Sequence, residues 1–499
     1  MVRAKRTIEE GVIESESLDS SRNGNYTTYG KTRARIAIIL PRGEAIRNFL
    51  HTGTLDEIAR AAEVVPLSVI PNEHLRNELT ERYQNCFELK LIPESKVVEN
   101  LRELLDLSHG RWLWSKAAQE RWLVHDHEAR VSGRQVNRTI KKLIGSAAAN
   151  PTGIRWLSKM ERASATWFRS TDRYVRFFEQ IKPTLVFNGS HVHSRVAIQA
   201  VQAAQWLGIP TAAFIFSWDN LTSQGRIIPQ YDYYLVWNEA QQNQLLEIYD
   251  SISPDRVIVT GTPQFDFHFR PEFQWTRAEF CEHVGADPNR PIVLYSTGMP
   301  NHMPGEPRIV EGIAEMLRHM RSYGPPQLLV RVYPKDHSGR FEEVKQRNPD
   351  VLFPEIPWER EWLTPRVEDA YLLSNTLRYA AVGINIASTV SLELCMFDKP
   401  VINVAYNPPG VDVGPLDFRR YYDFEHYRPL VDCGAVTLAG SEEEMRDLIT
   451  MALKNPQALS LKRQRLIRNM FGQRLDGYSG TRIAHCLVKI AELANQPVF

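Results

Sequence analysis

The sequence predicts an α/β protein built from two doubly wound parallel sheets. Short apolar runs alternate with amphipathic helical segments twice along the chain, first from about residue 34 and again from about residue 290. Such runs are typical of parallel strands that are buried on both faces and joined by crossover helices. With 499 residues, 43% of them hydrophobic, the chain is too long for one ordinary core, so we expect two domains.

The two series of strands set the expected domain limits. The first opens with "RARIAIILP" (33–41), a glycine turn and a helix, and is expected to span 34–270. The second opens with "PIVLYSTG" (291–298) and is expected to span 285–475. Residues 1–33 are polar and lack an apolar core, which predicts a disordered tail.

Between about 98 and 182 the strand signals stop and long helices are predicted as an insertion in the first domain. Residues 130–182 carry twelve Lys or Arg against three acids, and five of the eleven tryptophans lie between 100 and 182. One interpretation is a solvated helical hairpin with Trp packed beneath it. The other is a basic, aromatic surface that meets an anionic membrane or an anionic acceptor.

Composition argues against nucleic-acid binding, zinc binding and a membrane-spanning segment. The net charge of +1 gives no bias towards nucleic acid as a partner. The five cysteines form no C-x-x-C pair and have no His at ligand spacing, which indicates reduced thiols in the cytoplasm and no zinc site. The sequence contains no run of about 18 apolar residues, so no membrane-spanning helix is predicted. We therefore expect a cytoplasmic protein, with peripheral contact at the inner face of the membrane as a further option.

The stretch "GINIASTVSLELCMFDKPVINV" (383–404) places polar side chains where a predicted strand ends and a helix begins. Ser388 or Thr389 can cap that helix and leave N–H groups for a phosphate. Glu393, one turn further on, can accept hydrogen bonds from sugar or ribose hydroxyls. The structural alternative is that the hydroxyls only cap the helix and that Glu393 forms a surface ion pair.

With its preceding helix, "VEDAYLLSNTLRYAAVGINIASTVSLELCMFDKPVINV" resembles the sugar-nucleotide signature of GT-B glycosyltransferases. That group's relatives include the non-hydrolysing UDP-N-acetylglucosamine 2-epimerases and the CDP-glycerol glycerophosphotransferases. Asn385, Ser388, Thr389 and Glu393 fall on the frame of the signature, whereas Asp398 replaces its usual Gly. The resemblance implies a GT-B fold, with two Rossmann-like domains that face a cleft and a nucleotide sugar bound to the second.

Further stretches, in the same order as in that superfamily, extend the resemblance. They are "VIVTGTPQFD" (257–266), "LLVRVYPKDH" (328–337) and "RLDGYSGTRIAHCLVKIAEL". The last implies a terminal helix, within 476–499, that crosses back to the first domain. The resemblance also implies that phosphates are met by Arg331, Lys335 and His337 and by the turn Ser296, Thr297 and Gly298.

The first domain is expected to bind the acceptor. Its candidate catalytic residues are Asp219, Glu44 and His193, and its candidate acceptor-binding residues are His191, Asn220 and Arg226. Asp219, in "SWDNLTSQG", and Glu44, after the first strand, are alternative bases for the acceptor hydroxyl; each could equally cap a turn or form an ion pair. Ser190 and "SWDNLTSQG" replace the acids of the epimerases, so epimerase chemistry is not expected.

These observations predict an inverting glycosyltransferase that needs no metal or other cofactor. The eighth residue before Glu393 is Asn385, so the Glu pair of many retaining GT-B enzymes is absent, and no D-x-D motif in acidic context occurs. The expected partners are a nucleotide sugar, most simply UDP-linked, and a polysaccharide, lipopolysaccharide or glycolipid acceptor. The alternatives are a CDP-activated polyol-phosphate transferase and a non-catalytic nucleotide-binding scaffold.

Overall fold

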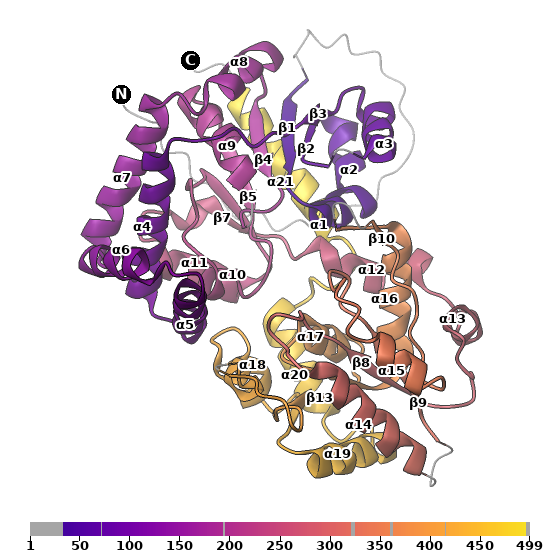
Figure 1. The fold of residues 1–499 in the computed structure, drawn as a ribbon. Coiled ribbons are helices and arrows are strands. Elements are labelled where there is room, and N and C mark those ends of the chain that lie inside the picture. The colour runs from indigo at the N-terminus through magenta and orange to yellow at the C-terminus, as the bar shows by residue number, and fades with distance from the viewer. Residues whose placement is uncertain are drawn as a thin grey trace, which may run out of the picture.

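Two parallel sheets organise the protein in a computed structural model that describes residues 33–70, 72–192, 195–320, 325–359, 363–414 and 416–495. The predicted tail 1–33 lies outside these residues except for Arg33. The first sheet has the order β3-β2-β1-β4-β5-β6-β7 and the second the order β14-β13-β12-β8-β9 (Figure 1). All neighbouring strands within each sheet run parallel. The predicted pair of doubly wound sheets is therefore confirmed.

The strands are short and almost wholly buried. In the first sheet they are β1 (Arg35–Leu40), β2 (Glu63–Ser68), β3 (Phe87–Glu88), β4 (Leu185–Asn188), β5 (Thr211–Phe214), β6 (Tyr233–Val236) and β7 (Val257–Val259). In the second they are β8 (Ile292–Ser296), β9 (Gln327–Arg331), β12 (Ala380–Asn385), β13 (Val401–Val404) and β14 (Thr437–Ala439). A small antiparallel pair joins β10 (Trp358–Glu359) to β11 (Thr364–Pro365).

Helices cover both faces of each sheet. Those of the first domain are α1 (Gly43–Ile46), the π-helix η1 (Arg47–His51), α2 (Thr54–Ala61), α3 (Glu73–Tyr83), α9 (Arg195–Trp206), α10 (Asn220–Ser223), α11 (Glu239–Ile248) and α12 (Asp266–Phe269). Those that follow are α13 (Arg277–Val284), α14 (Glu306–His319), α15 (Glu342–Arg347), α16 (Val367–Tyr379), α17 (Thr389–Met396), α18 (Arg428–Asp432), α19 (Glu442–Lys454), α20 (Ser460–Phe471) and α21 (Ser479–Ala494). The 3-10 turns are η2 (Pro254–Arg256), η3 (Pro263–Phe265), η4 (Pro271–Phe273) and η5 (Phe418–Asp423).

The predicted helical insertion lies between β3 and β4. It consists of α4 (Lys96–Leu113), α5 (Lys116–Val131), α6 (Gln135–Ala147), α7 (Pro151–Trp167) and α8 (Asp172–Ile181). Helix α4 packs against both α6 and α7, and the group forms the left edge of the molecule in Figure 1. Arg102 of α4 and Glu161 of α7 form a buried ion pair at 2.7 Å, and Gln202 of α9 donates to the same carboxylate.

The core follows the alternation of side chains along the strands. On β1, Ile36 and Ile38 face one hydrophobic cluster, while Ala37 and Ile39 face a second cluster on the opposite face of the sheet. The first cluster continues into the second domain, where it includes Ile292 of β8. A single apolar layer therefore runs through both domains.

Helix α21 packs against α2, β1 and β4 of the first domain, although it follows the second domain in sequence. Its N-terminal N–H groups at Ser479 and Gly480 donate to the carboxylate of Asp266 at 3.1 and 2.8 Å. Gly261 has a φ of +82°, and a Cβ there would lie 2.5 Å from Ser479 Oγ. The close approach of α21 thus requires glycine at this position.

Candidate functional site

The carboxyl ends of strands from both sheets meet at the domain boundary. Arg42 and Glu44 follow β1, Trp218 and Asp219 follow β5, and Lys335 follows β9. In open parallel sheets, ligands bind at these strand ends. The side chains at this boundary therefore form the candidate site.

Glu44 joins the two domains through a buried ion-pair cluster. Arg42 Nε and Nη2 donate to its two carboxylate oxygens at 2.8 and 2.6 Å, and Lys335 Nζ of the second domain also contacts it. Burial alone would raise the pKa of Glu44, but Arg42 and Lys335 outweigh burial and lower it to about 2. Such an acid holds a proton poorly, so Glu44 in this arrangement is a weak general base.

The backbone around Glu44 is fixed by the second domain. A Cβ on Gly43 would lie 2.5 Å from the carbonyl oxygen of Leu363 and 2.7 Å from Thr364 Oγ1, next to β11. Glycine is therefore needed for the two domains to approach here. The Arg42 guanidinium lies 4.8 Å above the ring of Phe216, which holds it beside Glu44.

Asp219, the other candidate base, lies at the start of α10. Its carboxylate accepts hydrogen bonds from Ser223 Oγ at 2.5 Å and from Asn220 Nδ2 at 3.4 Å. Burial lowers the pKa of His426 in the second domain, and the nearby Asp219 carboxylate acts in the opposite direction, which places the two side chains within electrostatic reach. The ring of Trp218 packs edge-on against His426, with centroids 5.2 Å apart.

The turn between β12 and α17 is rigidly held. Ser388 is the N-cap of α17 and accepts from Val390 N at 3.3 Å, while Thr389 Oγ1 accepts from Trp218 Nε1 across the boundary at 3.3 Å. Asn385 is fully buried, and its Oδ1 accepts from Ser388 N at 3.0 Å. Asn385 therefore shapes the turn that presents Ser388 and Thr389 to the first domain.

A network of buried polar side chains also holds this turn in place. Asn385 Oδ1 also accepts from Ser391 Oγ and from Asn403 Nδ2, at 2.9 and 3.0 Å. The Tyr427 hydroxyl lies 2.7 Å from Ser391 Oγ and 2.8 Å from Asn403 Oδ1. Because buried polar groups are costly when unpaired, this network fixes the end of β12 to the segment that carries His426.

Glu393 is buried at the domain boundary, where it faces His268 of α12. Its Oε2 lies 3.4 Å from His268 Nε2, but without hydrogen-bond geometry. Glu393 Oε2 and both ring nitrogens of His268 thus have no hydrogen-bond partner among the described residues. Arg47, on η1, lies within electrostatic reach of Glu393, Glu44 and Asp369, and burial lowers its pKa.

Asp398, which departs from the family signature, lies in the turn between α17 and β13. Its φ of +54° is in the left-handed region, which explains why glycine is usual at this position. Its carboxylate accepts from Ser460 Oγ at 2.6 Å and Arg463 Nε at 2.8 Å, both on α20. The substitution therefore anchors α20 to this turn.

Several predicted phosphate contacts are occupied by protein groups. Gly298 N donates to the buried carboxylate of Glu306 at 3.0 Å, and Arg331 Nη2 pairs with Asp369 at 2.6 Å. Thr297 Oγ1 accepts from Tyr333 N at 2.8 Å, and Ser296 is buried at the strand end. His337 is exposed. Burial raises the pKa of Glu306 to about 7, although Arg340 acts in the opposite direction.

Two of the predicted acceptor residues, His191 and Arg226, line a cavity of ≈ 520 Å³ between α4, α5, α6 and α9. His191 Nδ1 lies 3.3 Å from Phe214 O and 3.4 Å from Phe216 N. Arg226 lies 5.0 Å above the ring of Tyr249. Asn220 is buried and accepts from Ser217 N at 2.8 Å. His193 lies outside the described residues.

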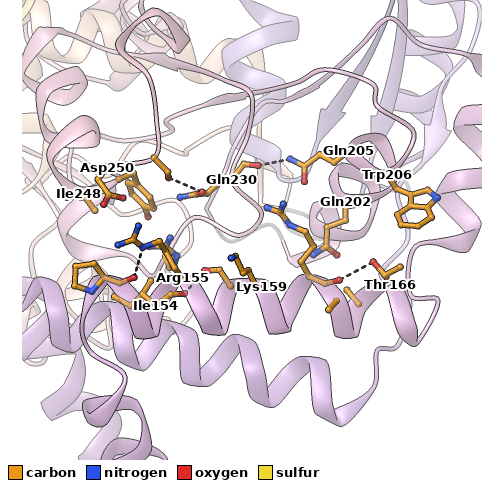
Figure 2. A pocket seen from close by; sticks show the side chains of 18 of the residues that line it. Ile154, Arg155, Lys159, Thr166, Gln202, Gln205, Trp206, Gln230, Ile248 and Asp250 are labelled. Carbon is orange, nitrogen blue, oxygen red and sulfur yellow. Dashed lines mark hydrogen bonds between the residues drawn. The ribbon is translucent and has the colours of Figure 1, made fainter. Parts of the chain in front are cut away.

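A larger cavity of ≈ 780 Å³ lies between α7, α9 and the end of α11. Figure 2 shows Arg155 and Lys159 of α7 on one side and Gln205 and Gln230 on the other. Among the described residues, no group of three or more His, Cys, Asp or Glu side chains could hold a metal ion.

Sequence reasoning missed three residues that folding brings to the boundary between the domains. His426, His268 and Arg47 belong to none of the motifs, and each gains its place only through folding. The available signals were the aromatic neighbours of His426 in "YYDFEHY" and the position of His268 two residues after "TPQFD". Neither signal names a role without the opposing domain.

Solved structures with a similar fold include UDP-N-acetylglucosamine 2-epimerases. The chain is similar to the enzyme from Neisseria meningitidis bound to UDP-GlcNAc, with 13% identity and a TM-score of 0.50 over 91% of this chain and 100% of that chain. It is similar to a Listeria monocytogenes protein described as a candidate enzyme of this class, with 12% identity and a TM-score of 0.52 over 91% and 95%. A further epimerase gives 12% identity and a TM-score of 0.50 over 92% and 96%.

No family model and no curated protein matches the chain. The structural similarity establishes the fold: the chain has the GT-B fold, as the sequence resemblance predicted.

Proposed function

We propose that the protein is an inverting glycosyltransferase that moves a sugar from a UDP-linked donor to a polysaccharide, lipopolysaccharide or glycolipid acceptor. The observation that carries this proposal is the position of Asp219, which follows β5 at the domain boundary, next to Trp218, whose ring packs against His426 of the second domain with centroids 5.2 Å apart. The ordered signature motifs and a similar structure bound to UDP-GlcNAc support the choice of donor.

Asp219 and His426 together provide a base for the acceptor hydroxyl. In the reaction the hydroxyl loses its proton to this pair while its oxygen attacks the anomeric carbon. The bond from that carbon to the diphosphate breaks, and the nucleoside diphosphate leaves. Burial lowers the pKa of His426, which favours the neutral, proton-accepting form of its ring but weakens it as a base, and the nearby Asp219 carboxylate opposes that shift.

The second domain offers groups for the donor. Glu393 Oε2 is buried without a hydrogen-bond partner among the described residues, so a ribose or sugar hydroxyl would satisfy it once the boundary opened to admit the donor. Ser388 and Thr389 begin α17, whose N-terminus favours phosphate. Arg47 supplies positive charge at the boundary, and Lys335 could add to it by exchanging the Glu44 carboxylate for the leaving diphosphate, which would then be stabilised without a metal.

Epimerase chemistry is disfavoured by the environment of Ser190. This residue stands where the epimerase motif has an acid, is fully buried, and its hydroxyl donates to the carbonyl of Val192 at 3.1 Å. A buried serine engaged in this way supplies neither a general acid nor a general base.

The non-catalytic scaffold remains the alternative that a specific observation favours. Gly298 N and Arg331, two of the predicted phosphate contacts, are both engaged by protein carboxylates. A polyol-phosphate transferase would use the same boundary but attack phosphorus. The three functions differ in the product that they release, so one assay separates them.

The test is a panel of UDP-, GDP- and CDP-activated donors, with and without EDTA, in which the released nucleotide is identified. A glycosyltransferase releases a nucleoside diphosphate and keeps its activity in EDTA, whereas a polyol-phosphate transferase releases CMP. Thermal denaturation with each free nucleotide tests binding independently, because a ligand at 100 times its Kd stabilises by about 2.7 kcal/mol. A thermal shift without turnover would favour the nucleotide-binding scaffold, and the absence of both would overturn the proposal.

Substitution of the proposed base sharpens the test. Asp219→Asn should lower kcat by about 10²–10⁴-fold, because it removes the group that accepts the proton. It should leave nucleotide binding intact, because Asp219 is not among the residues proposed to hold the nucleotide sugar. Asp255→Asn, an exposed acid of the first domain away from the boundary, is the matched control and should change neither. Equal activity of the two variants would exclude Asp219 as the base.

A further inference from the structure

Helix α6 of the insertion presents its apolar face to solvent. Val136, Ile140 and Leu143 are 75%, 52% and 68% exposed, and Ile144 is exposed as well. Their spacing of four, three and one residues puts them on one side of the helix. A surface helix of a globular protein usually turns such a stripe towards the core, so the orientation of α6 is the reverse of the usual one.

The charged face of α6 points inward instead. Arg138 Nε pairs with Asp126 of α5 at 3.1 Å, and Lys142 Nζ contacts the same carboxylate. Lys141 Nζ pairs with Glu103 of α4 at 2.5 Å. These ion pairs fix the helix with its apolar side outward. They also neutralise three of the twelve basic side chains of residues 130–182, which therefore add little to the positive charge of the surface.

Exposed apolar side chains also lie on the neighbouring helix α5 and on α7, which packs with α6 against α4. Among the described residues, eleven of the nineteen large hydrophobic side chains that are exposed lie between 114 and 168, so exposed apolar side chains are concentrated in the helical insertion. We call this set of side chains the apolar outer face, and its members on α5, α6 and α7 are Leu123, Val131, Val136, Ile140, Leu143, Ile144, Trp156, Met160 and Trp167.

Unpaired cations lie among these apolar side chains. Arg130, Arg134, Lys159, Arg162 and Arg169 are exposed, and none forms an ion pair with another described residue. Lys159 and Arg162 also line the ≈ 780 Å³ cavity beside α7. Figure 2 shows the side of α7 that faces this cavity, with Arg155 and Lys159 on it. Trp167 of the apolar outer face lines this cavity too, whose lining holds the acids Glu247 and Asp250 as well as these cations.

We propose that the apolar outer face docks on a lipid bilayer that contains anionic headgroups. Exposed Trp and aliphatic side chains enter the interface between headgroups and acyl chains, while the cations attract the negative surface. Among the described residues, every helix is too short or too polar to cross a bilayer, so the contact is peripheral.

The charge of this region argues against a second copy of the chain as the occupant. In a two-fold dimer the same patch meets itself. The arginines at 130, 134, 162 and 169 would then face other arginines, and the three acids of 130–182 offer little compensation. An anionic lipid surface supplies the complementary charge.

Vesicle binding tests the proposal without any nucleotide sugar, so its outcome is independent of the proposed reaction. The full chain is sedimented with vesicles of phosphatidylcholine and with vesicles that also contain phosphatidylglycerol. We expect binding to the anionic vesicles that weakens with added salt. The double variant Ile140→Glu/Leu143→Glu should abolish it, whereas Leu461→Glu, on α20 and 82% exposed, should not.

Charge removal gives a second, graded readout. Arg130→Gln/Arg134→Gln should lower the partition coefficient roughly 25-fold, about fivefold for each cation. Lys454→Gln, exposed at the end of α19, is the matched control. All these positions are exposed, so the thermal midpoint should stay constant and confirm folding. Equal vesicle binding by the outer-face and the control variants would overturn the proposal. So would a different result for the unaltered chain: no binding to vesicles, together with a dimer that Ile140→Glu dissociates.

Discussion

Replacing Glu44 by Gln tests whether the buried ion-pair cluster holds the two domains together. The substitution keeps the size of the side chain but removes the charge that faces Arg42 and Lys335. Both cations then stay buried without their partner, which is the costly way to break a buried pair. We expect the variant to be clearly less stable than the wild type at neutral pH.

The size of the effect follows from the pKa of Glu44. Its folded-state pKa of about 2 lies below the ordinary glutamate value of 4.5, and this difference corresponds to about 3 kcal/mol. Because the folded-state pKa is the lower one, this stabilisation is present above pH 4.5 and is lost as the pH falls towards 2. At pH 3.5 about 1.4 kcal/mol of it should be gone.

Urea denaturation of both proteins at several pH values between 7 and 3.5 measures this difference. Glu78→Gln is the control, because Glu78 forms an exposed helical ion pair with Arg82 and should leave the midpoint nearly unchanged. A difference below about 1 kcal/mol at pH 7 would refute the reasoning, since that is the range of surface pairs. So would a difference that grows as the pH falls.

Two further substitutions probe buried polar groups. Burial raises the pKa of Asp266 to about 6, so its contribution to stability is present below pH 3.8 and is lost as the pH rises through about 6. Asp266→Asn should abolish this part of the pH dependence of the urea midpoint. An unchanged pH profile of the midpoint would contradict the prediction. Tyr427→Phe removes the hydroxyl that bridges Ser391 and Asn403 and should cost about 1–3 kcal/mol in a thermal melt. Tyr478→Phe, at an exposed site, should cost nothing measurable.

The fold was predictable because strands buried on both faces leave a continuous apolar signal. Residues 36–40 of β1 are buried throughout, and the strand ends at a Pro-Arg-Gly turn that the sequence shows directly. The order of the motifs along the chain then made the GT-B arrangement predictable. The cap at Ser388 was also readable, because a strand, a polar pair and a helix follow one another within a few residues.

The rest depends on neighbours that are distant in sequence. Nothing local indicates that Gly298 N donates to Glu306 or that Asp219 faces His426. The direction of α6 was equally hidden, because an amphipathic helix reads the same whichever face is turned inward. Only the acids of α4 and α5, such as Asp126, decide that its lysines turn inward and are partly buried.

The position of α21 has a consequence for biosynthesis. Ile483 and Leu487 fill the layer against α2 and β4, so the first domain lacks one of its helices until the ribosome has made the second domain. Up to that moment a growing chain exposes the apolar groove that α21 later covers, and such surfaces attract chaperones or aggregate. A chain that stops before residue 479 would keep this defect, so a premature stop late in the message should leave an incomplete first domain.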